Sequence, residues 1–318
     1  PSYQVQFVEN IGVLLSKEET GQISASDLSE CIRRSRNVVK SQSQTMVHAI
    51  PTLHRVDGVD VQNPVGVFGK NLETETLVVL ADSDSILSQT RVLKGMQLHI
   101  GGLVYDGIAS SHIYLTEEER KQGAVLFDMG GQFTHVSVYK NDTLHHSAIL
   151  PIGGETISRD IAECLKITLP EAERLKVLYG DVMLSRVNPS QSIEASTQET
   201  GKKEIKTLLL CQIIEARILE LLKLTQKQLP SAFDPHYHFV LGGGGCRLKG
   251  LVDYVEQKYS IHVRDGLPDA LKNSLEDVQY ATSLGLILYA LKTKAVGFVA
   301  SERQQAFLKF KKWINKLF

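Results

Sequence analysis

The sequence predicts an α/β protein in which a small α+β unit precedes a larger domain of buried strands and helices. Two apolar strands predict the larger domain. The strand at 124–128 ends in a glycine turn, and the strand at 239–241 ends in four glycines. Before residue 98, strand-like and helix-like periods are mixed without such turns. With 318 residues, 42% of them hydrophobic, the chain is long enough for a well-buried core and about two domains.

The predicted small unit covers residues 1–98. Residues 3–8 have strand character and lead through residues 12–15 to a helix that is expected from about Ser26, with Glu30 placed to help cap it. A strand at 75–80 and a helix at 83–94 complete the unit. The first helix is expected to bury one apolar stripe, which consists of Leu28, Cys31, Ile32, Val38 and Val39.

The larger domain begins with strands at 124–128 and 134–139, and the turn between them predicts a hairpin. Residues 153–180 have helical character, whereas the polar segment 185–207 is expected to be an exposed loop. A long helix is expected at 204–229, where Pro230 stops it. Helices at 248–259 and 275–291 follow the four glycines.

Charge and cysteine content limit the class of protein. A net charge of −1 and a pI near 6.9 predict no attraction to nucleic acid. The last sixteen residues, 303–318, hold five basic and no acidic side chains, which leaves 30 basic and 36 acidic residues elsewhere. No apolar run reaches the roughly 20 residues that span a bilayer, and no signal sequence opens the chain. Because position 1 is not Met, we expect a fragment or a processed form.

The four cysteines lie far apart and form no C-x-x-C pair, which favours a reducing, cytoplasmic compartment over disulfides or structural zinc. Two histidine pairs, His145-His146 and His236-x-His238, have no acidic or cysteine partner at ligand spacing, so no metal site is predicted. We find no residues with the pattern of a Ser-His-Asp, Cys-His or paired-carboxylate hydrolase, and we name no catalytic residue.

The first candidate site is the strand end Asp128-Met-Gly130-Gly131. Glycines let backbone N–H groups approach phosphate oxygens, and a carboxylate at a strand end can hold a magnesium-bound water. An ordinary β-hairpin turn explains the same residues about as well. The motif alone therefore leaves both interpretations open.

The second candidate site is the turn Gly242 to Gly245, which lies between a strand and a predicted helix. Such a turn lets the backbone approach a nucleotide, and the dipole of the following helix favours negative charge. Four successive glycines carry an entropic penalty of up to about 1 kcal/mol each relative to alanine, so a purely structural turn would not need so many. A tight strand-to-helix crossing is the alternative.

The C-terminal segment has a two-sided helical pattern. Seven apolar residues between 305 and 318 fall within an arc of roughly 140°, opposite Lys309, Lys312, Asn315 and Lys316. Such a helix is expected to lie in the interface of a bilayer with its lysines toward anionic head groups, although a terminal helix packed in the core is the alternative. The residues predicted to contact the membrane are Phe307, Phe310, Lys311, Lys312, Trp313, Ile314, Lys316, Leu317 and Phe318.

The order of the motifs resembles the second half of an actin-like ATPase, and within that superfamily it resembles the bacterial cell-division family FtsA. The resemblance covers nearly the whole chain and is carried by Asp128-x-Gly-Gly, Gly153-Gly154, the segment 172–176, Val240-Leu-x-Gly-Gly-Gly245, and the segments 47–51, 63–66, 107–111, 115–120 and 280–285. It implies an α/β, actin-like (ribonuclease-H-like) fold that is N-terminally incomplete, with a small α+β inserted subdomain and a C-terminal amphipathic helix. The implied division is 1–98, the small inserted subdomain; 99–122, a remnant of the first actin-like subdomain; 123–268, the second actin-like domain with its core at 123–152 and 236–268 and its insertion at 153–235; 269–292, a returning helix; 293–303, a linker; and 304–318, the membrane helix.

The resemblance also implies ATP with Mg as cofactor and a set of residues that contact the nucleotide. Gly107, Ala109 and Gly285 would lie where two connecting helices cross. The implied second phosphate loop contains Asp128, Gly130 and Gly131, the residues near the ribose and base are Glu173 and Lys176, and the adenosine motif contains Gly243, Gly244 and Gly245.

Two departures from the family pattern concern this cofactor. The chain begins after the position of the first phosphate loop, and Gln132, Phe133 and His135 replace a glycine, a threonine and a carboxylate of the second. We therefore predict weak or absent ATP hydrolysis and impaired nucleotide binding.

The resemblance implies an adaptor that tethers filaments of the tubulin-like protein FtsZ to the cytoplasmic face of the cell membrane at the division site. The implied partners are the FtsZ C-terminal peptide, which would dock on residues 153–235, further copies of the chain, other division proteins and anionic lipids. An actin-superfamily kinase or ATPase is one alternative, and a pilus-assembly (PilM-like) scaffold is another.

Overall fold

The computed structural model describes residues 5–16, 21–197, 201–229, 233–268 and 280–293. The chain divides into two compact units. The first unit contains residues 1–105 together with 138–147, and the second contains residues 106–137 together with 148–318.

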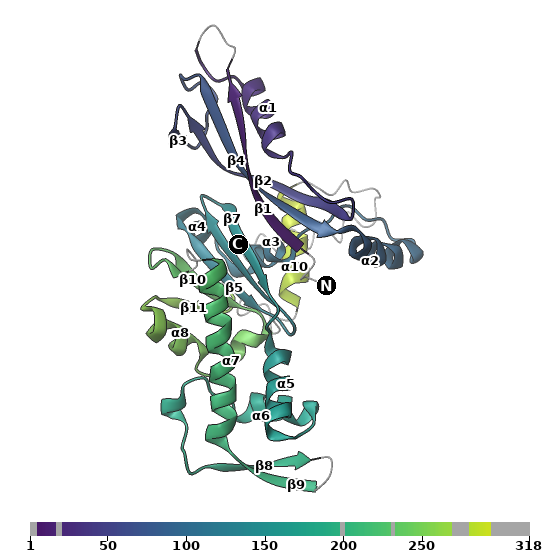
Figure 1. Ribbon diagram of the computed structural model, residues 1–318, viewed down its shortest axis with the longest axis vertical. Coiled ribbons are helices and arrows are strands. Elements are labelled where there is room, and N and C mark those ends of the chain that lie inside the picture. The colour runs from purple at the N-terminus through teal and green to yellow at the C-terminus, as the bar shows by residue number, and fades with distance from the viewer. Residues whose placement is uncertain (1–4, 17–20, 198–200, 230–232, 269–279, 294–318) are drawn as a thin grey trace, which may run out of the picture. The chain divides into compact units, whose positions relative to one another are not determined.

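The first unit is built on a four-stranded sheet of order β1-β4-β2-β3. All the strand pairs are antiparallel, and helix α1 packs against β1 and β4 (Figure 1). Its core gathers Leu14, Ile23, Cys31, Val56 and Leu72. The elements are β1 (Val5–Leu15), α1 (Ala25–Ser35), β2 (Gln44–Val56), β3 (Val59–Val61), β4 (Asn71–Asp82) and α2 (Ser83–Gly95).

Helix α1 exists as predicted, but its predicted cap and end are wrong. Ser24 is the N-cap, and Ser24 and Asp27 form a reciprocal capping box. Glu30 lies too far along to cap and instead pairs with Arg33 and Arg34. The helix ends at Ser35, so Val38 and Val39 lie beyond its apolar stripe.

The strands of this sheet are longer than the sequence pattern indicated. The strand predicted at 75–80 extends over Asn71–Asp82, and β2 was not predicted at all. The register of β2 shifts between Met46 and His48 and again between Pro51 and Leu53. Each shift interrupts the period-two alternation on which a strand prediction depends.

The second unit contains most of a five-stranded sheet of order β11-β10-β5-β6-β7, whose hairpin tip at 138–147 groups with the first unit. Strand β10 runs parallel to both β5 and β11, and β5 and β6 are neighbours joined by a short turn. Two helices, α3 and α4, precede the sheet. The elements are α3 (Asp106–Tyr114), α4 (Glu117–Gln122), β5 (Ala124–Met129), β6 (Thr134–Lys140), β7 (Thr143–Leu150), β10 (His238–Gly242), α8 (Leu251–Tyr259), β11 (Val263–Asp265) and α10 (Ala281–Lys292).

Between β7 and β10 lies a mainly helical insertion in which α7 contacts α5, α6 and β9 (Figure 1). The helical segment predicted at 153–180 is two helices, because Lys166 adopts a left-handed conformation and Thr168 caps the second one. The elements are α5 (Gly154–Leu165), α6 (Leu169–Tyr179), β8 (Ser192–Thr197), β9 (Gly201–Lys206) and α7 (Thr207–Gln228).

The exposed loop predicted at 185–207 is wrong, because this segment forms the antiparallel hairpin β8-β9. Ile193, Ala195 and Ile205 are its buried residues. Three apolar side chains among many polar ones are a weak strand signal. Helix α7 accordingly begins at Thr207, after the predicted start at Glu204.

Candidate functional site

The two glycine turns lie side by side at one edge of the five-stranded sheet. Strands β5 and β10 are parallel, and Gly242 is in register with Asp128. The carboxyl ends of neighbouring parallel strands meet at the same edge, where ligands of open α/β sheets bind. A pocket of about 710 Å³ opens there. Its lining includes Tyr114, Asp128, Gly130, Gly131, Gly154, Glu155, Ile157, Glu173, Lys176, Val177, Gly243, Gly244, Gly245, Arg247, Leu248, Lys249 and Thr282.

All eight residues predicted to contact a nucleotide line this pocket, although they come from three separate segments of the chain. Asp128 and its two glycines come from β5 and its turn, Glu173 and Lys176 from α6, and the other glycines from the turn after β10. The fold therefore brings together the two motifs that the sequence alone left as separate, weak signals.

The turn after β5 is bonded to the start of α5. The N–H of Gly154 donates to the carbonyl oxygen of Gly130 at 3.0 Å, and the N–H of Glu155 donates to that of Gly131 at 2.7 Å. The first amides of α5 are therefore already hydrogen-bonded within the protein. A Cβ built on Gly131 would meet no atom within 4 Å, so a ligand can approach the backbone of this turn closely.

Packing explains three of the four glycines in the turn after β10. A Cβ on Gly242 would lie 2.9 Å from the ring of Tyr114, and one on Gly245 would lie 2.5 Å from the side chain of Met129. Gly243 has a φ of +80°, and its Cβ would lie 2.5 Å from Asp128 Oδ1. Contrary to the prediction from the sequence, the turn needs these three glycines for structural reasons alone. Gly244 alone of the four has open space around it.

Lys176 joins α6 to the start of α5. Its Nζ donates to the carbonyl oxygen of Gly154 at 2.8 Å, to Ser158 Oγ at 2.9 Å and to Glu173 Oε2 at 2.7 Å. An ammonium group has three donors, so these three contacts use all of them. Glu173 has a half-exposed side chain and is the member of the pair that remains able to accept from a ligand hydroxyl.

Electrostatics at the strand end favour neutral groups. Asp128 is 9% exposed, and burial raises the pKa of its carboxyl group, although His135 and a bond from Ser110 oppose that shift. Burial lowers the pKa of His135. Both shifts follow from the cost of placing a charge away from water. A bound cation would reverse this cost for Asp128 by favouring its carboxylate.

Several other predicted features lie elsewhere. Gln132 is exposed and is absent from the pocket lining within the described part of the chain. His146 Nδ1 lies 2.6 Å from Glu9 Oε1, a partner 137 residues away that sequence spacing did not reveal. Among the described ranges, no group of three or more His, Cys, Asp or Glu residues has the arrangement of a metal site. The predicted membrane-contacting residues, Phe307 to Phe318, lie outside the described residues.

The sequence did not point to Tyr114, Arg247 or Thr282 as pocket residues. Arg247 lies two residues after Gly245, and this closeness to the glycine turn could have identified it as a pocket residue. Tyr114 and Thr282 reach the pocket from α3 and from α10, so only the fold brings them there.

The fold and the glycine-lined pocket define an actin-like protein. The chain matches the solved PilM-PilN type IV pilus biogenesis complex with a TM-score of 0.58 and 16% identity, covering 89% of this chain and 76% of that one. It matches MreB5 of Spiroplasma citri bound to ADP with a TM-score of 0.54 and 14% identity, covering 65% of both chains. At these identities, the likeness shows the fold alone.

Family models give the particular assignment. The model described as "Cell division protein FtsA" matches residues 125–285, and that described as "SHS2 domain inserted in FTSA" matches residues 4–80. The chain therefore belongs to the FtsA family of cell division proteins. Similar relatives are FtsA of Escherichia coli K12, 26% identical over 322 residues (96% of this chain, 76% of the relative), and FtsA of Pseudomonas aeruginosa, 25% identical over 288 residues (88% and 69%).

Proposed function

We propose that the protein is a division adaptor that tethers FtsZ filaments to the cytoplasmic face of the cell membrane and associates with further copies of itself. Membership of the FtsA family carries this proposal. The family is one of cell division proteins. The partners of such an adaptor are the C-terminal peptide of FtsZ, other division proteins and anionic lipids.

The proposed membrane attachment is peripheral. No helix in the described ranges is long and apolar enough to cross a membrane. The amphipathic pattern of residues 305–318 supports attachment in the plane of the interface. Each lysine near an anionic surface contributes about 1 kcal/mol, so one tail binds reversibly. Several tails on one filament bind together much more firmly, because each further contact is made at high effective concentration.

We propose that the pocket holds an adenine nucleotide with magnesium, more weakly than an intact phosphate clamp would, and that hydrolysis is slow or absent. The described residues fit this group: Gly131 and Gly244 leave open space for phosphate oxygens, and Glu173 offers an acceptor for a ribose hydroxyl. The magnesium ion bound with the nucleotide would supply the positive charge that makes the carboxylate form of Asp128 favourable. Phe133 has no hydroxyl group with which to contact a phosphate. The hydroxyl group of the next residue, Thr134, already donates to the carbonyl oxygen of Ile152 at 2.7 Å.

A co-flotation experiment tests the adaptor function. Fluorescent FtsZ C-terminal peptide, the protein and liposomes containing anionic lipid are mixed and centrifuged in a density gradient. We expect the peptide to float with the liposomes only when the protein is present, and a scrambled peptide to stay behind. Peptide that never floats, although the protein itself does, would reject FtsZ tethering while leaving membrane attachment in place.

A turnover assay separates the adaptor from an actin-superfamily kinase. We expect release of ADP from magnesium-ATP at or near the background rate, with or without candidate sugar acceptors. Robust turnover would favour the enzyme. A PilM-like scaffold would bind a pilus-assembly peptide in the flotation assay in place of the FtsZ peptide.

A further inference from the structure

Tyr114, the last residue of α3, contacts the turn after β10 and is bonded by an arginine of β11. Its side chain is 1% exposed, and the pocket lining includes it. The N–H of Gly243 donates to the Tyr114 hydroxyl at 2.9 Å. The ring lies directly against Gly242, where a Cβ would be 2.9 Å from two ring carbons. One tyrosine therefore contacts both of the first two glycines of the turn after β10.

The hydroxyl also lies near the other glycine turn. Burial raises the pKa of Tyr114, so the phenol stays neutral at physiological pH. Gly243 lies between these two side chains, since its Cβ would be 2.5 Å from Asp128 Oδ1. Tyr114 thus supports the turn after β10 at the point where it meets the end of β5.

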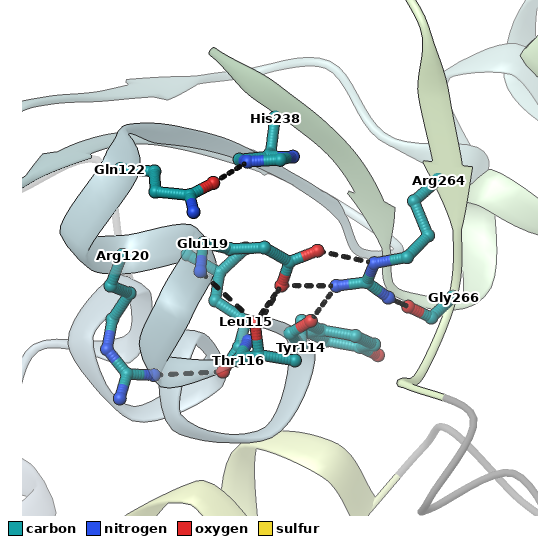
Figure 2. Close-up of polar contacts among 9 residues, drawn as sticks. All are labelled: Tyr114, Leu115, Thr116, Glu119, Arg120, Gln122, His238, Arg264 and Gly266. Carbon is teal, nitrogen blue, oxygen red and sulfur yellow. Dashed lines mark hydrogen bonds and ion pairs between the residues drawn. The ribbon is translucent and has the colours of Figure 1, made fainter.

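The backbone of Tyr114 is itself held by an arginine of β11. Figure 2 shows Arg264 donating to the carbonyl oxygen of Tyr114, to Glu119 and to the carbonyl oxygen of Gly266. The Arg264 Nε lies 2.7 Å from Glu119 Oε1, and its Nη2 lies 3.0 Å from Glu119 Oε2. Such a bidentate pair fixes direction as well as distance. Both side chains are largely buried, so solvent competes little for these bonds.

A second arginine, Arg120, hydrogen-bonds to backbone carbonyl groups at the end of α3. Arg120 is 3% exposed, and its Nη1 donates to the carbonyl oxygen of Leu115 at 2.9 Å (Figure 2). The same nitrogen donates to the carbonyl oxygen of Ser111 at 3.3 Å. The last carbonyl groups of a helix have no partner within the helix. Arg264 donates to the carbonyl oxygen of Tyr114, and Arg120 donates to carbonyl oxygens on either side of it in the sequence. These bonds fix the backbone from which the Tyr114 ring extends.

We propose that Tyr114 is a positioning residue of the pocket, which holds the glycine turn after β10 in its ligand-binding conformation, and that Arg264 and Glu119 hold Tyr114 in place. The consequence for ligand affinity rests on the proposed nucleotide site, whereas the effect on the turn does not. Without the hydroxyl, the Gly243 N–H loses its acceptor, and Gly244 and Gly245 no longer have a fixed place in the pocket wall.

Hydrogen exchange of the full chain tests the effect on the turn without any ligand. The variant is Tyr114→Phe, and the matched control is Tyr105→Phe, which removes another buried hydroxyl that hydrogen-bonds to a side chain, Ser147 Oγ at 2.9 Å. We expect the amides of residues 242–247 to exchange about tenfold faster in Tyr114→Phe, the equivalent of one lost hydrogen bond, and at the wild-type rate in Tyr105→Phe. Arg264→Lys keeps the charge but loses the fork, and should accelerate the same amides by a smaller factor.

Unchanged exchange at residues 242–247 in Tyr114→Phe, or an equal rise in Tyr105→Phe, would overturn the proposal. ADP affinity, measured with magnesium, gives the second readout, and we expect it to fall about tenfold in Tyr114→Phe and to stay at the wild-type value in Tyr105→Phe. If the wild type binds no ADP while the turn loosens as expected, the nucleotide site fails and the positioning role stands. If the wild type and Tyr114→Phe bind ADP equally, the positioning role of Tyr114 fails and the nucleotide site stands.

Discussion

Gly285 of α10 lies against the backbone of Ala109 in α3. A Cβ built on Gly285 would lie 1.9 Å from the Ala109 carbonyl oxygen, a distance that no packing arrangement permits. The resemblance to actin-like proteins implied small residues where two connecting helices cross, and these two helices do pack on each other. The absence of a side chain at position 285 is therefore what lets α10 approach α3.

Gly285→Ala should destabilise the protein by about 2 to 3 kcal/mol, because the added methyl group forces the helices apart. The sign is decisive, since alanine in a helix interior is otherwise about 1 kcal/mol better than glycine. The matched control is Gly95→Ala in α2, where a Cβ would meet no atom within 4 Å. Urea denaturation followed by circular dichroism measures both. Equal or greater stability of Gly285→Ala would contradict the packing described above.

Gly244→Ala should weaken nucleotide binding and leave stability nearly unchanged. Its Cβ has open space in the protein but projects where a ligand would approach the turn. Gly243→Ala is the contrasting variant, because its positive φ and the contact with Asp128 make any side chain costly. We expect Gly243→Ala to lower the melting temperature and Gly244→Ala to reduce only the rise in melting temperature on adding magnesium-ADP. A full rise in Gly244→Ala would count against the pocket.

The sequence located both glycine turns correctly because each follows a short apolar strand, a local signal. It could not show that they share one pocket, since that depends on β5 and β10 being parallel neighbours. Tyr114 was missed for a similar reason: its partner Gly243 lies 129 residues away. The hairpin β8-β9 was missed because Lys202, Lys203 and Glu204 dominate the composition of β9, whereas only Ile205 is buried there.

Glu171 links the missed hairpin to α6, and its ionisation should make stability depend on acid. Its carboxylate accepts from Arg174 at 2.8 Å and 2.7 Å and from the N–H of Ser196 in β8 at 2.8 Å. The bond from Arg174 is the main cause that lowers the pKa of Glu171 from 4.5 to about 2. Because the folded-state pKa is lowered, the stabilisation is present above about pH 4.5 and is lost as the pH falls toward 2.

Glu171→Gln should therefore reduce stability at pH 7 and flatten its decline between pH 4.5 and 2. Glu204→Gln, which removes an exposed carboxylate from the same hairpin, controls for the change in net charge. The free energy of unfolding, measured by urea denaturation at several pH values, compares the two variants. A decline as steep in Glu171→Gln as in the wild type would show that the contact does not contribute.

Trp313→Glu should release the protein from liposomes that contain anionic lipid. In the helical pattern of residues 305–318, Trp313 lies at one edge of the apolar arc and is its largest side chain, so a carboxylate there would replace an apolar contact with the interface by a charge. Asn315→Glu adds the same charge to the face that carries the lysines, where it remains in water. We expect flotation to be lost in Trp313→Glu and only weakened in Asn315→Glu, with more salt weakening it further. Equal flotation of both variants would mean that the two faces of the segment are equivalent at the lipid surface, which an amphipathic anchor does not allow.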